Sequence, residues 1–511
     1  MSSIWKEKIK SPTELAVIIQ NKKSQGKKVA QCHGVFDLLH RGHLHQFEQV
    51  KSKADILVVT LTADQFVLKG PGRPVFNQNI RADMLAALEL VDFVTIVESV
   101  NAIGIIKLLQ PNYYVKGQSY QEAYKDITGK IGPEVEAIGA VGGEIIFTNE
   151  MPIRSTPLIN SYIDPYPEDV LLYLDLFKKK YSFASLLDMV NQFKNLKILL
   201  IGETIIDQYD YVEAMDISSK GGIMATRHLS SESFVGGILA CANHMATFCS
   251  TVDVISAIGT RNSYEGFIFR SLAENVKPWF LNKEGTDTLV KRRQVENNYF
   301  TKQSETYYGD ESCLKEEEEK KLLARLNSVM NCYDLIFIVD YGHGLLTPRI
   351  VDFISTPSHN PKLAVNAQVN SANRGFHLIT RYPFADFVSL TQFEARIAFS
   401  DKKSSPQDLA EKLLKKLGAS AVALTLGRKG SVLSDRSSFC STPGFSKQVV
   451  DTVGAGDAFF SLAALSYVSG FSIEFTGFVG NLAGALSTTY IGNKSSVTKS
   501  MFLNFAQTIL S

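Results

Sequence analysis

The feature that most constrains this chain is a series of short, continuous apolar runs separated by stretches with helical periodicity. Two clear examples are residues 56–61 (ILVVTL) and residues 334–340 (DLIFIVD). An apolar run without a polar face is typical of a strand that is covered on both sides of its sheet. Because such strands alternate with helical stretches, we expect parallel sheets with crossover helices. The sequence therefore predicts an α/β fold.

The apolar runs fall into two groups that flank a polar, helix-rich middle. The first group predicts strands at residues 28–32, 56–61, 91–97, 113–116 and 144–148. The second group predicts strands at residues 196–202, 252–259, 334–340, 386–390 and 421–427, and exposed accessory strands at residues 288–296 and 299–305. We therefore expect a first domain at residues 1–160 with its core at residues 28–160, a helical linker at residues 161–195, and a second domain at residues 196–511.

Charge and composition exclude several classes of protein. The 511 residues include 53 Lys and Arg against 52 Asp and Glu. With charges so balanced, the chain has no net positive charge large enough to attract nucleic acid or an anionic membrane. No stretch approaches the roughly 18 apolar residues of a membrane span, and the charged start of the chain lacks the apolar region of a secretory signal. The six cysteines form no C-x-x-C pair, which indicates reduced thiols. We therefore expect a cytoplasmic protein that binds neither nucleic acid nor membranes.

The string HGVFDLLHRGH at residues 33–43 is the most informative motif of the first domain. It follows a predicted strand and precedes an amphipathic segment, so that backbone N–H groups and a helix dipole can face a phosphate. Gly34 permits close approach of the backbone, while His40 and His43 would project from one helix face. Two imidazoles there can donate hydrogen bonds to a phosphate that gains charge in a transition state. The alternatives are two exposed histidines on a structural helix, or a metal pair that lacks its third ligand.

This string resembles the G-x-F-D-x-x-H-x-G-H signature of the nucleotidyltransferase superfamily, which includes glycerol-phosphate cytidylyltransferases and heptose-phosphate adenylyltransferases. The resemblance covers about residues 28–160 and implies a Rossmann-like domain. In this family a sugar or polyol phosphate attacks the α-phosphorus of a nucleoside triphosphate, and pyrophosphate leaves. The resemblance implies catalytic roles at the triphosphate for His40, His43 and Lys69. It implies nucleotide contacts for Gly34, Phe36, Asp37, Arg81, Ser155 and Thr156.

The string DTVGAGDAFF at residues 451–460 is the second strong motif. The glycines on either side of Ala455 form a tight turn and helix formers follow, so that backbone N–H groups and a helix dipole meet in one small cavity. Asp457 is placed at the cavity edge to take a proton from a hydroxyl that attacks a phosphoryl group. The alternative is an aspartate that only caps a helix after a glycine loop.

This second string resembles the D-T-x-G-A-G-D-A-F motif of ribokinase-type carbohydrate kinases, and the resemblance spans about residues 196–511. It implies a Rossmann-like core with a small β-lid, and Asp457 as the general base. The anion hole and the other nucleotide contacts that it implies are Gly454, Ala455, Gly456, Thr425, Gly427 and Gly430. The implied sugar contacts are Asp207, Gly236, Gly237, Asn243 and Asp340, and the metal-associated carboxylate is Glu394.

Together the two motifs resemble the bifunctional heptose-phosphate kinase/nucleotidyltransferases, although the kinase usually comes first in that family. We expect a bifunctional enzyme that phosphorylates a sugar or sugar phosphate with ATP and then transfers a nucleotidyl group from ATP or CTP. Mg²⁺ would accompany both nucleotides, and the product would be activated heptose or a related precursor of surface polysaccharide. The alternatives are synthesis of a CDP-polyol or CDP-sugar, and a sugar-sensing protein with one inactive site. A homodimer is an open alternative to a monomer.

Overall fold

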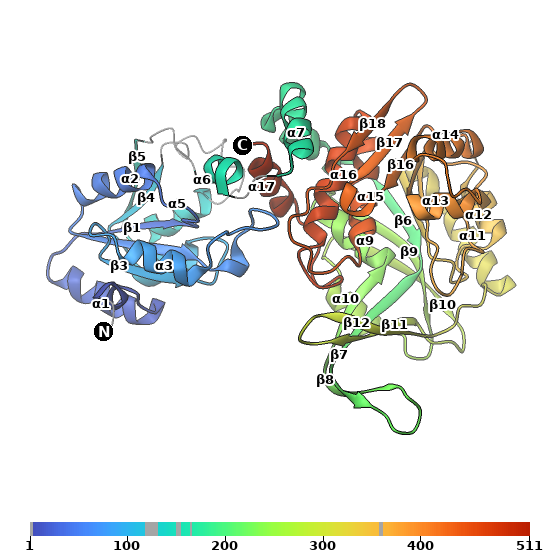
Figure 1. Cartoon of the computed structure of the whole chain (residues 1–511), viewed down its shortest axis with the longest axis horizontal. Coiled ribbons are helices and arrows are strands. Elements are labelled where there is room, and N and C mark those ends of the chain that lie inside the picture. Colours follow the sequence, from blue (N-terminus) through green and yellow to red (C-terminus); the bar gives the residue numbers. More distant parts are fainter. Residues whose placement is uncertain (1–3, 118–130, 150–154, 164–165, 357–360) are drawn as a thin grey trace. The chain divides into compact units, whose positions relative to one another are not determined.

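The computed structural model describes residues 4–117, 131–149, 155–163, 166–356 and 361–511. These residues divide into two units (Figure 1). Unit 1 comprises Met1–Leu174 together with Ser500–Ser511, and unit 2 comprises Asp175–Lys499. The last helix of the chain therefore belongs mainly to the unit that contains the N-terminal motif. The domain limits at residues 160 and 195 stay a prediction.

Unit 1 is built on a parallel sheet of five strands in the order β3-β2-β1-β4-β5. The strands are β1 (Val29–Gly34), β2 (Ile56–Thr62), β3 (Phe93–Val97), β4 (Tyr113–Gly117) and β5 (Glu144–Thr148). Each strand lies where an apolar run predicted it, with small differences at the ends. The predicted Rossmann-like α/β fold of the first domain is confirmed.

Two layers of helices cover this sheet. The helices of unit 1 are α1 (Pro12–Ser24), α2 (Arg41–Lys51), α3 (Gln78–Ala86), α4 (Ile103–Leu109), α5 (Ile131–Ala140), α6 (Ser155–Leu158) and most of α17 (Lys499–Ile509), while α7 (Glu168–Lys180) crosses the limit between the units. α1, α4 and α5 share a core with Val58 on one face of the sheet, whereas α2 and α3 share a core with Leu57 and Val59 on the other. Because successive strand residues point to opposite faces, one uninterrupted apolar run fills both cores.

The loop after β1 lies where the strand order reverses. From β1 the chain continues outward through β2 and β3, and it then crosses to β4 on the other side of β1. The carboxyl ends of β1 and β4 therefore border the crevice in which open α/β sheets bind their ligands. The motif at residues 33–43 begins on β1 and leads into α2 at this crevice.

Unit 2 contains a nine-stranded sheet in the order β10-β9-β6-β13-β14-β15-β16-β17-β18. Its strands are β6 (Ile198–Gly202), β9 (Val252–Gly259), β10 (Val276–Lys283), β13 (Leu335–Asp340), β14 (Lys362–Ala367), β15 (Phe387–Thr391), β16 (Ala421–Thr425), β17 (Ser431–Asp435) and β18 (Phe439–Thr442). The strands from β10 to β16 in this order pair in parallel, and β17 and β18 add an antiparallel edge.

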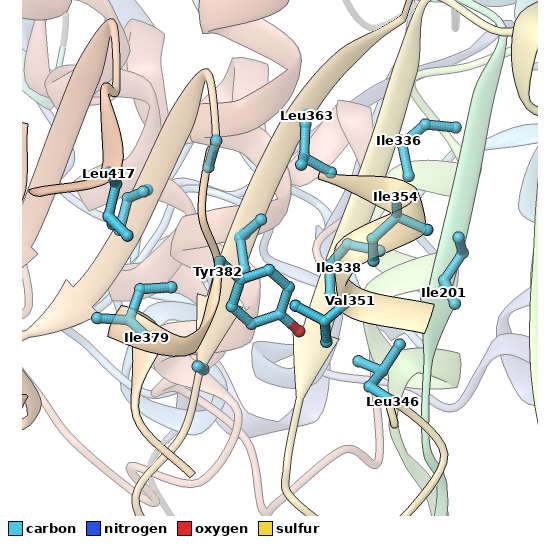
Figure 2. Packing of buried hydrophobic residues seen from close by; sticks show 14 of the residues in the cluster. Ile201, Ile336, Ile338, Leu346, Val351, Ile354, Leu363, Ile379, Tyr382 and Leu417 are labelled. Carbon is cyan, nitrogen blue, oxygen red and sulfur yellow. The ribbon is translucent and has the colours of Figure 1, made fainter. Parts of the chain in front are cut away.

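Helices cover both faces of this sheet as well. They are α8 (Phe183–Gln192), α9 (Ile238–Ala246), α10 (Glu265–Ser271), α11 (Glu316–Val329), α12 (Pro348–Ile354), α13 (Gln392–Ala398), α14 (Pro406–Leu417), α15 (Ala455–Val468) and α16 (Ile473–Ser487). α11, α12 and α14 enclose a core that contains Ile338, Val351 and Tyr382 (Figure 2). Phe460 of α15 stacks on Phe337 of β13, with 4.2 Å between ring centroids. Within the described ranges, none of the helices combines the length and the apolarity that crossing a membrane requires.

A smaller sheet of unit 2 has the order β12-β11-β7-β8. Its strands are β7 (Thr204–Ile217), β8 (Met224–Gly237), β11 (Leu289–Glu296) and β12 (Thr301–Tyr308). β11 and β7 are parallel, and the other two pairs are antiparallel. The predicted small lid is confirmed, and its accessory strands are β11 and β12. The long hairpin of β7 and β8, whose tip projects in Figure 1, was not predicted.

Candidate active sites

The first candidate site starts at the carboxyl end of β1. Phe36 has a positive φ of 50°, which turns the chain from β1 toward α2. Its buried ring lies 5.2 Å from the His43 ring and 5.9 Å from the Phe47 ring, measured between centroids. A Cβ at Gly34 would lie 3.1 Å from the Phe36 ring. Gly34 and Phe36 therefore shape the loop and support His43.

His40 and His43 form the start of α2. His40 Nδ1 accepts a hydrogen bond from the N–H of Gly42 at 3.1 Å, and His43 Nδ1 accepts one from the N–H of His40 at 3.4 Å. The two imidazole rings stack with 3.9 Å between their centroids. Because each Nδ1 is an acceptor, each neutral ring carries its proton on Nε2. Both half-buried rings therefore offer an Nε2–H donor to a ligand.

The electrostatics of this site suit a polyphosphate. Burial, together with the charges of His40 and Lys69, lowers the pKa of His43 to about 3. Burial also lowers the pKa of His40 and that of Lys69. Lys69 is half-buried, and its ammonium has no hydrogen bond or ion pair with any residue that the structure describes. Two neutral donors thus lie near one unpaired cation, an arrangement that can stabilise developing phosphate charge.

Asp37 and Arg81 hold the surrounding loops together. Asp37 Oδ1 accepts the N–H groups of Val75 and Phe76 at 2.8 and 3.1 Å. Arg81 is fully buried and donates to three backbone carbonyls and to the Asp64 carboxylate. The nucleotide contacts expected of Asp37 and Arg81 stay predictions. To bind a nucleotide directly, either side chain would have to give up one of these hydrogen bonds within the protein.

Ser155 and Thr156 begin the short helix α6. Ser155 Oγ donates a hydrogen bond to the Leu38 carbonyl at 2.9 Å, and Thr156 is half-buried. This bond joins two segments that are far apart in the sequence, and it places the start of α6 beside the loop that follows β1. The phosphate contacts expected of both hydroxyls stay predictions.

The second candidate site lies at the start of α15. Gly454 is the N-cap with a positive φ of 83°, and a Cβ there would lie 2.6 Å from Asn493 Oδ1. No side chain of the described part of the chain caps this helix end. The amide of Ala455 donates to the Thr452 carbonyl at 3.3 Å, while the amide of Gly456 meets no acceptor among those residues. The Gly456 N–H is therefore free to bind an anion.

Asp457, in the first turn of α15, has the environment of a general base. Its Oδ1 accepts a hydrogen bond from the Tyr341 hydroxyl at 3.2 Å. The pKa of Asp457 is raised to about 7, mainly because the group is buried. The hydrogen bond from Tyr341 and the charge of Lys291 oppose this rise, whereas the negative charge of Asp207 adds to it. A carboxylate whose pKa lies near the operating pH can both take up and release a proton.

Asp207 of β7 is held beside the glycine pair that precedes α9. Arg293 Nη1 donates to Asp207 Oδ1 at 2.6 Å, and Asn493 Nδ2 donates to Oδ2 at 3.0 Å. A Cβ at Gly236 would lie 2.2 Å from Asp207 Oδ2, and one at Gly237 would lie 2.4 Å from a backbone carbonyl. Gly236 thus leaves the space that the carboxylate occupies, and Gly237 permits the close approach of the Glu203 carbonyl.

Asn243 and Asp340 are engaged within the protein. Both polar atoms of the Asn243 amide bond backbone groups at the end of α10, at 2.9 and 3.0 Å. Asp340 is fully buried and accepts hydrogen bonds from Gly342, Arg381 and Tyr382. These bonds give Asn243 and Asp340 a role in shaping the site. The sugar contacts expected of them stay predictions.

The glycine turn expected near the nucleotide follows β16, which ends at Thr425. Gly427 and Gly430 have positive φ values of 62° and 88°. A Cβ at Gly430 would lie 2.1 Å from the Thr442 carbonyl, whereas position 427 faces open space. The backbone of another segment therefore packs directly against Gly430, whereas Gly427 has space beside it. The nucleotide contacts expected of this turn stay predictions.

Glu394 lies in a capping box at the start of α13. Its Oε2 accepts the N–H and the hydroxyl of Thr391, each at 2.8 Å, and its Oε1 accepts the Val369 N–H at 3.1 Å. Among the residues that the structure describes, no group of three His, Cys, Asp or Glu side chains could hold a metal ion. Because Mg²⁺ that accompanies a nucleotide is held largely by phosphate oxygens and water, one or two protein carboxylates suffice, and the metal-associated role expected of Glu394 stays a prediction.

Sequence reasoning missed Lys291, Arg293 and Asn493, which surround Asp207. Lys291 and Arg293 lie on one face of β11, because alternate residues of a strand share a face. The basic run at residues 291–293, in an otherwise ordinary lid strand, was the signal that could have found the first two. Asn493 lies in a loop far along the chain, and no local pattern marks it.

Comparisons with known proteins match both parts of the chain. The model of the pfkB family of carbohydrate kinases matches residues 195–500, and a cytidylyltransferase-like model matches residues 32–160. The crystal structure of phosphofructokinase-2 from Escherichia coli in complex with potassium has a TM-score of 0.51 and 15% sequence identity, and it covers 61% of this chain and 99% of that chain. At this identity the likeness supports the fold alone.

Two curated relatives are bifunctional proteins named HldE. The HldE of Aliarcobacter butzleri is 39% identical over 139 residues, which is 27% of this chain and 29% of that protein. The HldE of Geobacter metallireducens is 39% identical over 167 residues, which is 32% of each. The chain thus aligns with less than a third of the length of either relative. Because the kinase model covers more than half of it, the chain belongs to the pfkB family of carbohydrate kinases, and a cytidylyltransferase-like domain precedes its kinase domain.

Proposed function

We propose that the chain catalyses two successive reactions on one sugar. Unit 2 phosphorylates a sugar phosphate with ATP, and unit 1 transfers a nucleotidyl group to the phosphorylated product. The presence of both family domains and the similarity to the bifunctional HldE proteins support this pairing. The first reaction supplies the phosphate that the second reaction consumes. The product is an activated heptose or a related precursor of surface polysaccharide.

In unit 2, Asp457 takes the proton of the acceptor hydroxyl while that oxygen attacks the γ-phosphorus of ATP, and ADP leaves. The free N–H of Gly456 and the dipole of α15 stabilise the charge on the phosphoryl oxygens. Mg²⁺ would enter with ATP, bound mainly by phosphate oxygens. The pKa of Asp457, raised to about 7, supports its assignment as the base.

The environment of Lys291 is the observation that favours a sugar phosphate over a neutral sugar as the acceptor. It is 7% exposed, and its ammonium lies 5.2 Å from the Tyr307 ring centroid and 5.4 Å from that of Tyr341. It has no hydrogen bond or ion pair with the described residues. In the register of β11 and β7 it is directly opposite Asp207, and the charges of Asp207 and Asp457 act on it. Because a buried cation without a hydrogen-bonding partner is costly, an anionic group on the acceptor would stabilise it.

In unit 1, a phosphate oxygen of the sugar attacks the α-phosphorus of the nucleoside triphosphate, and pyrophosphate leaves. The Nε2–H groups of His40 and His43 and the ammonium of Lys69 bind the phosphate oxygens that gain charge. No covalent intermediate with the protein is needed. The match to a cytidylyltransferase-like model supports a direct comparison of CTP with ATP as the donor.

The test uses the full chain with matched pairs of sugars, each with and without a phosphate group. ADP and pyrophosphate are measured separately with ATP or CTP. We expect ADP with the phosphorylated acceptors, and we expect Lys291→Met to raise the KM for them. Arg292→Met is the matched control, because this cation is the next residue of β11, lies on the opposite face and pairs with Asp210. Asp457→Asn should abolish ADP formation, and His43→Ala should strongly slow pyrophosphate release from the phosphorylated product.

Two results would contradict the proposal. Equal turnover of neutral and phosphorylated acceptors, unchanged by Lys291→Met, would exclude the role of Lys291. ADP formation without pyrophosphate release from either nucleotide would exclude the second reaction, and would favour a protein with one inactive site.

A further inference from the structure

The last helix of the chain contacts the loop that carries Lys69. Phe505 of α17 is buried, and a Cβ at Gly70 would lie 2.0 Å from Phe505 Cδ2. Gly70 also has a positive φ of 93°, a conformation that favours glycine. The loop backbone therefore lies directly against the Phe505 ring.

A chain of polar contacts fixes the other end of this loop. Arg73 Nη2 donates to Asn160 Oδ1 at 2.5 Å, and Asn160 Nδ2 donates to the Thr508 carbonyl of α17 at 2.7 Å. Arg73 also pairs with Asp37, at 3.4 Å. The Arg73 side chain is 4% exposed, so these bonds are shielded from water and costly to break.

Lys69 depends on these neighbours for its position. Its ammonium meets no hydrogen-bonding or ion-pair partner within the described ranges, whereas Gly70 and Arg73 are both held. The positive charge of Lys69 nevertheless acts on His43 and helps to lower its pKa. A small displacement of residues 69–73 would therefore move the cation relative to the imidazoles.

We propose that Phe505 and Asn160 are positioning residues of the nucleotidyltransferase site, and that α17 holds residues 69–73 so that the Lys69 ammonium meets the triphosphate. This proposal rests on the nucleotidyl transfer proposed for unit 1. It assigns to that reaction a helix that lies almost entirely beyond the residues matched by the kinase model. The helix acts through Lys69 and does not contact the reacting atoms.

The first test measures the loop itself in the full chain. Hydrogen exchange at the amides of residues 69–76 should increase in Phe505→Ala and return toward the parent level in Phe505→Leu. Leu109→Ala is the matched control, because Leu109 is equally buried but lies in the core on the face of the sheet that α1, α4 and α5 cover. Unchanged exchange in Phe505→Ala, or an equal increase in Leu109→Ala, would overturn the proposal.

The second test measures catalysis. We expect Phe505→Ala to lower kcat/KM for pyrophosphate release at least about tenfold, while ADP formation by unit 2 in the same chain stays at the parent level. If Phe505 acts through Lys69, the double variant with Lys69→Met is no slower than Lys69→Met alone. Losses that simply add would overturn the proposal. A parent chain that releases no pyrophosphate would refute the proposed transfer itself, and the exchange measurement would still decide whether α17 holds the loop.

Discussion

Asp457 sets the pH dependence expected of the kinase reaction. It must be deprotonated to accept the proton of the acceptor hydroxyl, and burial raises its pKa to about 7. The deprotonated fraction is then about one tenth at pH 6 and about nine tenths at pH 8. We therefore expect kcat/KM for ADP formation to rise about tenfold between these two pH values.

Tyr341→Phe tests the cause of this dependence. The Tyr341 hydroxyl donates to Asp457 Oδ1 at 3.2 Å and thereby lowers the pKa of the carboxyl group. A hydrogen bond to a charged group is worth about 1.5–3 kcal/mol. The lower end of this range corresponds to a shift of about one pH unit. We expect the midpoint of the profile to move by about that amount toward higher pH.

The assay is the initial rate of ADP formation from a fixed sugar phosphate between about pH 5.5 and 9, with Asp457→Asn as the blank. The phosphate of the acceptor itself titrates near pH 6, so the parent chain and Tyr341→Phe are compared at each pH with the same substrate. A flat profile for the parent chain, or a midpoint that Tyr341→Phe moves toward lower pH, would refute Asp457 as the base.

Further expected outcomes concern both units. Because the pKa of His43 is lowered to about 3, His43 should contribute no inflection to the pH profile of pyrophosphate release between about pH 5 and 8, and His43→Ala should slow this release about 10²- to 10³-fold. Gly454→Ala would bring a Cβ within 2.6 Å of Asn493 Oδ1 at a positive φ, so ADP formation should fall while pyrophosphate release persists. Tyr382→Phe removes the hydroxyl that donates to Asp340 at 2.9 Å. Chemical denaturation should therefore show that the free energy of unfolding of unit 2 falls by about 1.5–3 kcal/mol. An unchanged denaturation midpoint would contradict this contribution of Tyr382.

The strands of the two main sheets could be predicted because they are covered on both faces. β2 and β13 are buried at every position, and their sequences are apolar except for Thr60 and Thr62 in β2 and Asp340 at the end of β13. β7 begins buried and ends exposed, and β8 is exposed or half-buried until its last four residues. Their polar sequences have no single period, and their pairing depends on contacts that a local pattern does not contain. This is why the hairpin was missed while the central strands were found.

The residues of the candidate sites also fall into two groups, those that a local sequence pattern predicts and those that it does not. His40, His43 and Asp457 lie in short motifs next to a strand or a helix start, and such motifs can be recognised locally. Lys291 enters the second site only through the pairing of β11 with β7, which residue spacing alone does not reveal. A motif also does not separate residues that shape a loop from residues that touch a ligand. Asp37, predicted from the motif as a nucleotide contact, is bonded to backbone amides of its own unit.

The backbone passes between the two units twice, once after Leu174 and once before Ser500. Splitting the gene at the first passage would leave α17, with its buried Phe502 and Phe505, on the kinase fragment and remove it from the fragment that it packs against. Each fragment would then display apolar surface that the intact chain covers, which favours aggregation or reassociation of the halves. The two halves are therefore not interchangeable modules, because the second half of the gene encodes part of the first half's fold.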